Sequence, residues 1–153
     1  MQTVLNGTTA LAKYARADDW VMVHDAVRPC VRHADLDKLL AAVASSPDGA
    51  LLAVPIADTV KRADAQATIE ETVSRRGLWR ALTPQIFRLG VLREALTAVA
   101  AANEDITDDS AAVEHLGARP RVVEGSADNI KITCLSDLAL AEMFLRQQTS
   151  AVS

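Results

Sequence analysis

The chain has 153 residues, a length typical of one folded domain with a core of its own. Half of the residues are hydrophobic and 24% are charged, and no apolar run reaches the length of a membrane span, so we expect a soluble globular protein without membrane contact. The net charge of −4 disfavours nucleic acid as a partner, because a phosphate backbone requires a basic surface. Small phosphorylated ligands stay compatible with it, since a few arginines and lysines suffice to make one cleft positive.

Helical and strand-like periods alternate along the chain, which predicts an α/β fold with residues 1–153 as a single domain. The first part of the chain predicts a helix over residues 3–16 capped by Thr3, a buried strand over 20–24, an amphipathic helix over 34–45 and a buried strand over 50–55. The later part predicts a short strand over 79–82, a helix over 88–101, a short helix from Thr107 or Asp108 to His115, strands over 121–124 and 130–133, and a last helix capped by Ser136 with Leu138, Ala141 and Leu145 on one face.

Residues 58–75 interrupt this alternation. Polar and apolar side chains alternate there at period two around a polar turn near residues 63–67, which predicts a β-hairpin. Its hydrophobic face is too thin to be stable alone, so we expect the hairpin to project and to pack on a partner. A mobile, solvated hairpin fits the same pattern.

The segment around Asp25 is the first candidate site. An apolar run ends abruptly in His24 and Asp25, and a proline-containing turn with Arg28 follows. Open α/β sheets place ligand chemistry at the carboxyl ends of their strands, and a carboxylate beside an arginine suits a metal ion held together with phosphates. The alternative is a surface aspartate that caps the next helix, with Arg28 in solvent.

The two cysteines, Cys30 and Cys134, fit neither a disulfide framework nor a zinc pattern. We expect both to be reduced, as in a cytoplasmic protein.

Five blocks, taken in order, resemble the 2-C-methyl-D-erythritol 4-phosphate cytidylyltransferases, enzymes of non-mevalonate isoprenoid synthesis. They are residues 23–29 (VHDAVRP), 55–61 (PIADTVK), 75–85 (RRGLWRALTPQ), 106–109 (ITDD) and 123–133 (VEGSADNIKIT). The resemblance implies a Rossmann-like nucleotidyltransferase, a three-layer α/β sandwich in which residues 58–75 form a β-arm that embraces the second subunit of a homodimer. It also implies a bacterial cytoplasmic enzyme that joins CTP to 2-C-methyl-D-erythritol 4-phosphate with Mg²⁺ and releases pyrophosphate.

The same resemblance implies roles for individual residues. The residues implied to be catalytic are Lys131, Asp25 and Arg75, and the metal ligand is Asp25. The residues implied to bind the nucleotide are Thr3, Ala26, Asp25 and Lys131. Those implied to bind the second substrate are Thr59, Arg75, Thr83, Arg28 and Thr107. A lysine on an apolar strand edge is costly unless an anion meets it, which independently favours a phosphate contact for Lys131. Arginine suits a phosphate because its planar fork bonds two oxygens at once.

Several roles stay open. Arg28 either anchors the loop around Asp25 or contacts a phosphate. We interpret Asp108 and Asp109 as charges that complement the dipole of the short helix, with a substrate hydroxyl bound by Thr107 or Asp108 as the alternative. His24 is interpreted as structural, because the attacking phosphate is already ionised and needs no base.

The first residues, Met1 to Gly7, resemble the middle of the family, and the glycine-rich loop that wraps the triphosphate has no counterpart in this sequence. We therefore expect the chain to correspond to the C-terminal two-thirds of such an enzyme and to be inactive alone. Two rival functions remain. One is a cytidylyltransferase for ribitol phosphate or another polyol phosphate, and the other is a non-catalytic dimerisation module.

Overall fold

Four strands form the central sheet of the computed structural model, which describes residues 2–150. The sheet order is β1 (Trp20–Val23), β5 (Trp79–Arg88), β2 (Ala50–Pro55) and β6 (Arg121–Glu124). β5 runs antiparallel to both of its neighbours, and β2 pairs with β6 in parallel. The remaining elements are α1 (Gln2–Leu11), α2 (His33–Val43), β3 (Val60–Ala63), β4 (Ile69–Val73), α3 (Leu89–Ala102), α4 (Asp109–His115) and α5 (Leu135–Ser150).

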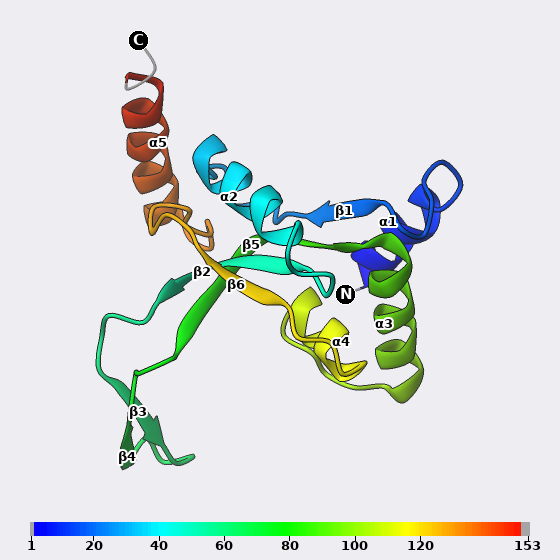
Figure 1. Cartoon of the computed structure of the whole chain (residues 1–153). Helices are drawn as coiled ribbons and strands as arrows, with labels where there is room; N and C mark the ends of the chain where they lie inside the picture. The colour runs from blue at the N-terminus through cyan, green and yellow to red at the C-terminus, as the bar shows by residue number, and fades with distance from the viewer. Residues whose placement is uncertain (1, 151–153) are drawn as a thin grey trace.

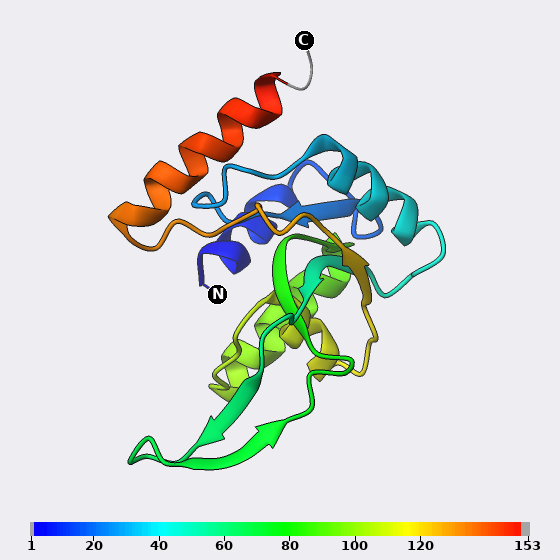
Figure 2. The same cartoon turned by 90° about the vertical axis from the view of Figure 1, so that its left-hand side faces the viewer.

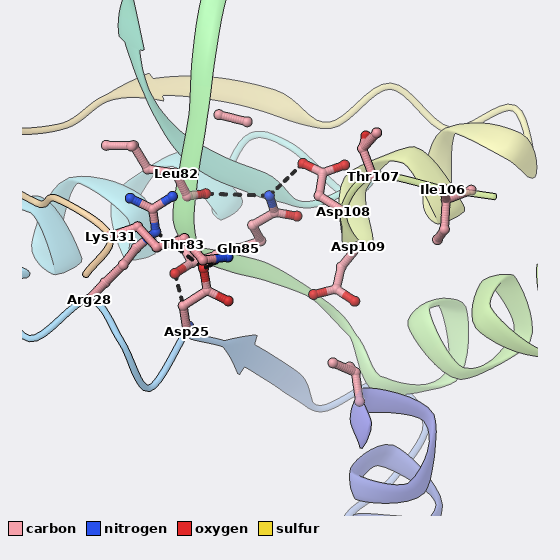
Figure 3. A pocket seen from close by; sticks show the side chains of 12 residues that line it. Asp25, Arg28, Leu82, Thr83, Gln85, Ile106, Thr107, Asp108, Asp109 and Lys131 are labelled. Atoms are coloured by element: carbon pink, nitrogen blue, oxygen red, sulfur yellow. Dashed lines mark hydrogen bonds and ion pairs between the residues drawn. The ribbon is translucent and has the colours of Figure 1, made fainter. Parts of the chain in front are cut away.

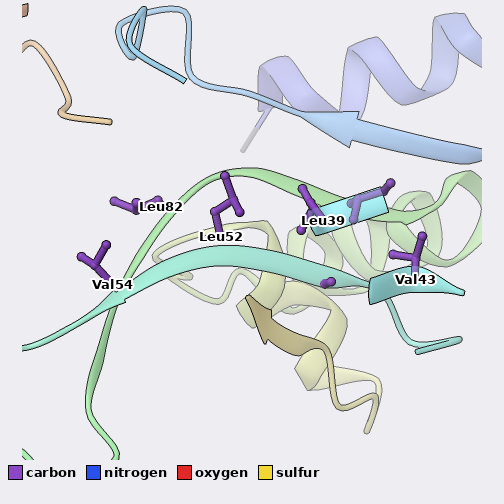
Figure 4. Packing of buried hydrophobic residues seen from close by; sticks show 7 residues of the cluster. Leu39, Val43, Leu52, Val54 and Leu82 are labelled. Carbon is purple, nitrogen blue, oxygen red and sulfur yellow. The ribbon is translucent and has the colours of Figure 1, made fainter. Parts of the chain in front are cut away.

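Helices cover both faces of the sheet, which gives the three layers that the family resemblance implies (Figure 1). On one face, Leu39 and Val43 of α2 pack against Leu52, Val54 and other buried residues of β2 and β5 (Figure 4). On the other face, Phe87 of β5 packs with the buried leucines and valines of α3 and α4, and α1 adds Val4 and Leu5. β2 is therefore buried from Ala50 to Val54, as expected of a continuous apolar strand with a covered face on either side.

Two elements extend away from these layers. The β3–β4 hairpin projects from one end of the sheet and α5 from another, as Figures 1 and 2 show from two sides. The predicted hairpin is therefore confirmed. Val60 and Val73 are its only residues within β3 and β4 that are even partly buried.

The structure corrects the predicted N-terminal helix and the first strand. The helix ends at Leu11 instead of residue 16. The N–H groups of Lys13 and Tyr14 bond three residues back instead of four, and the Arg16 N–H donates to the Asp19 carboxylate. Thr3 lies inside the first turn of α1 and is not its cap. β1 ends at Val23, before His24, and is half-buried, since among the described strands it pairs with β5 alone.

The strand predicted over 79–82 is confirmed, but its predicted end is wrong, because β5 continues through Thr83, Pro84 and Gln85 to Arg88. The Thr83–Pro84 peptide bond is cis. The register against β2 shifts between Leu51 and Ala53, opposite this stretch of β5, so an irregularity in the ladder accommodates a residue that has no N–H to donate.

The end of the chain differs as well. Residues 130–133 form no strand; their neighbour is the turn after β1, where the Ile132 N–H donates to the Val27 carbonyl. α5 begins at Leu135, so Ser136 lies in its first turn and is not its cap. Asp137 of the same turn reaches back, and its carboxylate accepts from the backbone N–H groups of Thr133 and Cys134, which precede the helix. These bonds lower the pKa of Asp137 to about 2.

The apolar face predicted for the last helix is only partly correct, because Ala141 is buried whereas Leu138 and Leu145 are exposed. Both thiols are free, as expected. No helix within residues 2–150 combines the length and the apolar character needed to cross a membrane.

Candidate active site

A cavity of about 330 Å³ opens beside the centre of β5 and gathers residues from five separate segments (Figure 3). One wall is the turn after β1, the floor is β5, and the opposite wall is the loop that enters α4. The lining residues are Val4, Asp25, Arg28, Ala81, Leu82, Thr83, Gln85, Ile106, Thr107, Asp108, Asp109 and Lys131. Its size suits a small molecule, and its lining carries both signs of charge.

Asp25 is the centre of the charged wall. Arg28 Nε lies 3.3 Å and Lys131 Nζ 3.1 Å from the same carboxylate oxygen, Oδ2. Burial raises the pKa of Asp25, but the hydrogen bonds and charges of Lys131 and Arg28 outweigh it and hold the pKa below its usual range. Asp25 is therefore ionised at neutral pH, and its Oδ1 receives no hydrogen bond or ion pair from residues 2–150.

The turn that carries Asp25 is fixed to β5. The Asp25 N–H donates to Thr83 Oγ1 over 3.0 Å, and Thr83 Oγ1 also lies 2.9 Å from His24 Nδ1. The other ring nitrogen of His24 lies 2.9 Å from the Arg28 carbonyl oxygen. His24 is thus structural, as predicted, and the Thr83 hydroxyl has two partners within the protein in addition to its place on the cavity wall.

The opposite wall is also tied to β5, through Gln85. Its Nε2 donates to Asp108 Oδ2 over 2.8 Å, and its Oε1 accepts from the Ser110 N–H at the same distance. Asp108 caps α4 by accepting from the Ala111 N–H, which confirms the helix-terminal role predicted for it. Asp109 lies in the cavity, and burial, together with the charges of Asp108 and Asp25, raises its pKa.

Sequence reasoning missed two buried amides, Gln85 and Asn129. Asn129 donates from Nδ2 to the backbone carbonyl of Thr83 over 2.8 Å, and the backbone carbonyl of Asn129 accepts from Arg28 Nη1 at 3.0 Å. Both residues stand in the blocks quoted for the family resemblance. The available signal was an uncharged polar side chain beside apolar neighbours, which requires a buried partner.

The structure brings five of the predicted site residues together. Asp25, Arg28, Thr83, Thr107 and Lys131 all line the cavity. The other four do not line it: Thr3 adjoins the lining residue Val4, Ala26 follows Asp25 in the turn, and Thr59 and Arg75 flank the hairpin at exposed positions.

Three layers with a carboxylate and two cations at a strand end define a Rossmann-like α/β domain with a site for a charged ligand. The family model of 2-C-methyl-D-erythritol 4-phosphate cytidylyltransferase matches residues 1–147. The enzymes of that name from Dechloromonas aromatica and Haemophilus influenzae are 51% identical over 145 residues and 49% identical over 144 residues. The alignments cover 95% and 94% of this chain and 62% of each relative.

Solved structures agree with the sequence relatives. The chain resembles the cytidylyltransferase structure from Francisella tularensis with a TM-score of 0.84 at 38% identity, covering 92% of this chain and 65% of that one. The Thermus thermophilus structure gives a TM-score of 0.78 at 32% identity, covering 93% and 68%. The chain belongs to the 2-C-methyl-D-erythritol 4-phosphate cytidylyltransferase family. It spans about 62% of the length of the curated relatives that it matches.

Proposed function

We propose that the chain provides the catalytic wall of a cytidylyltransferase that acts on CTP and 2-C-methyl-D-erythritol 4-phosphate. In this reaction a phosphate oxygen of the second substrate attacks the α-phosphorus of CTP. The bond from that phosphorus to the oxygen bridging to the β-phosphate breaks, and pyrophosphate leaves with the electron pair. The observation that carries the proposal is the strand-end carboxylate of Asp25 held between Lys131 and Arg28 on a cavity wall.

The donor atoms of this wall fit a magnesium ion. Asp25 is ionised, and its Oδ1 receives no hydrogen bond or ion pair from the described residues. Residues 2–150 contain no group of three or more His, Cys, Asp or Glu side chains able to hold a metal, so a cation here takes most of its ligands from phosphates and water. Mg²⁺ behaves in this way, since it keeps waters and commonly uses one or two carboxylates with substrate phosphates. When bound, it would supply positive charge to the phosphates of CTP.

Lys131 and Arg28 differ in their freedom to meet a substrate. Arg28 is largely buried, with 11% of its side chain exposed, and is engaged by both Asp25 and the Asn129 carbonyl. This favours the anchoring role for Arg28 over a phosphate contact. Lys131 is 47% exposed and has Asp25 as its ion-pair partner, so its ammonium can turn to a phosphate with little rearrangement. We assign Lys131 the role of stabilising the negative charge that builds up at the α-phosphate during transfer.

The cavity alone is poorly matched to two polyanions, because its lining has three carboxylates and two cations. The missing positive charge is supplied in our proposal by Arg75 of a second copy, with Thr59 beside it, so that the arms make the enzyme a homodimer. Arg75 is exposed, and its guanidinium has no partner among the described residues. Thr107 offers a hydroxyl to the same substrate, and Thr3 and Ala26 border the nucleotide. Thr83 lines the wall, but its hydroxyl holds the turn through the Asp25 N–H and His24 Nδ1 and is not counted as a substrate donor.

The test uses a chimaera in which the 145 aligned residues of this chain replace the matched part of the 51%-identical relative. With CTP, 2-C-methyl-D-erythritol 4-phosphate and Mg²⁺, we expect ³¹P NMR to detect pyrophosphate together with a new diphosphate diester. Ribitol 5-phosphate serves as the matched competing substrate. A folded chimaera that is inactive while the parent enzyme is active would contradict the proposal. A preference for ribitol 5-phosphate would contradict the assignment of 2-C-methyl-D-erythritol 4-phosphate as the substrate.

A further inference from the structure

We propose that His24 is a positioning residue whose two ring nitrogens hold the turn from Asp25 to Arg28 in its working geometry. Nδ1 faces Thr83 Oγ1 and Nε2 faces the Arg28 carbonyl oxygen, each at 2.9 Å. One ring therefore bridges the end of the turn and the β5 hydroxyl that holds its beginning. The effect of His24 on turnover rests on the proposed function, whereas its effect on the turn does not.

The direction of these bonds follows from the capacity of each atom. The Arg28 carbonyl oxygen can only accept, so His24 Nε2 must carry a proton. Thr83 Oγ1 accepts from the Asp25 N–H, and its single proton can then be donated to Nδ1. All four groups are satisfied by the neutral Nε2–H tautomer. In the Nδ1–H tautomer, an unprotonated Nε2 would face a carbonyl oxygen, which is repulsive.

The turn that His24 holds is connected by hydrogen bonds to every charged residue of this wall. The Arg28 N–H closes the turn on the Asp25 carbonyl over 3.0 Å, and the Arg28 side chain bonds the Asp25 carboxylate and the Asn129 carbonyl. Asn129 lies two residues before Lys131 and bonds the Thr83 carbonyl. Displacement of the turn therefore changes the separation of Asp25, Arg28 and Lys131, the three groups on which the proposed chemistry depends.

His24 itself is exposed, although both of its nitrogens are bonded. An exposed ring contributes little to the core, so its loss should cost little global stability. Substitution of His24 should therefore alter the geometry of the turn without unfolding the chain, and the two effects can be measured separately.

The first experiment uses the 153-residue chain itself. Long-range ¹H–¹⁵N NMR of the unaltered protein should give the pattern of the Nε2–H tautomer for His24. In His24→Leu, amide hydrogen exchange at Asp25 and Ile132 should accelerate at least about tenfold, while the melting temperature stays within about 2 °C of the unaltered chain. His24→Gln carries an acceptor and a donor on one amide, as the neutral ring does, and should restore most of the protection. His33→Leu, at another exposed histidine, is the matched control and should leave exchange unchanged.

An Nδ1–H tautomer, or unaltered exchange at Asp25 and Ile132 in His24→Leu, would overturn the proposal. The second experiment places the same variants in the chimaera. There His24→Leu should lower kcat about 10- to 100-fold and raise the Mg²⁺ concentration needed for half-maximal rate, and His24→Gln should recover to within about fivefold. Normal turnover in His24→Leu would overturn the functional part. An inactive unaltered chimaera would instead defeat the proposed function and leave the exchange result to decide the positioning role.

Discussion

The cavity walls and the β3–β4 hairpin are held in opposite ways. Each wall of the cavity is bonded to β5, one through Thr83 and the other through the buried Gln85. The hairpin is exposed along nearly its whole length, and its side-chain bonds, such as Arg62 to Glu71, join residues of the hairpin to one another. The fold thus fixes the charges of the cavity wall in place and leaves the side chain of Arg75, beside the hairpin, without a partner among the described residues.

This difference indicates a division of labour. The wall that must hold reacting groups to within a fraction of an ångström is preorganised by hydrogen bonds. In the proposed homodimer the arm would contribute charge and gain order from the subunit that it contacts, because a two-stranded hairpin is marginal in water. Substitutions in the two regions should therefore fail in different ways.

The largest effect should come from Asp25→Asn. The change keeps the size of the side chain but removes the charge that pairs with Lys131 and Arg28 and that would bind Mg²⁺. We expect turnover of the chimaera to fall on the order of 10³-fold, with circular dichroism unchanged. Initial rates measured across a Mg²⁺ titration check this, and rates equal to those of the unaltered chimaera at ordinary Mg²⁺ would remove Asp25 from the site.

Lys131→Ala should have the next largest effect. Its ammonium would stabilise the negative charge that redistributes at the α-phosphate during transfer. We therefore expect the activation barrier to rise by about 2–4 kcal/mol, which lowers kcat. Steady-state kinetics separate the two constants. If the KM for CTP rises and kcat does not change, Lys131 is a ground-state binder and its assigned role is wrong.

A smaller effect, on stability, should follow from Gln85→Leu. The leucine leaves the Ser110 N–H without its acceptor and removes a donor from Asp108, so the free energy of unfolding should fall by about 1–3 kcal/mol. Urea denaturation of the 153-residue chain measures it.

Arg62→Ala on the hairpin is the control for an exposed site, because it removes a side-chain ion pair that lies in solvent, whereas the bonds of Gln85 are buried. That change should cost less than about 1 kcal/mol. Equal losses in the two variants would contradict the contrast between a bonded wall and a self-contained arm.

The three layers and the places of Thr83, Thr107 and Lys131 in the site were implied by the family resemblance. From local signals, the sequence itself predicted the α/β alternation, the hairpin and a charged site at Asp25 and Arg28. It did not predict the course of β5, since a proline at position 84 normally argues against the interior of a strand and only the shifted register with β2 admits it. Nor did it find Gln85 and Asn129, whose roles depend on partners 23 and 46 positions away along the chain. Bonds of this kind are set by tertiary packing.

The central claim is that a rigid wall on one chain is completed by Arg75 from the arm of another, and subunit mixing tests it most directly. Chimaeras carrying Asp25→Asn or Arg75→Ala should each be nearly inactive alone. After exchange, half of the dimers are mixed, and in these one site carries both lesions and the other carries neither. About a quarter of the unaltered activity should therefore return if pairing is random. No recovery, with exchange verified by mass spectrometry, would place Arg75 in the site of its own chain or outside the site altogether.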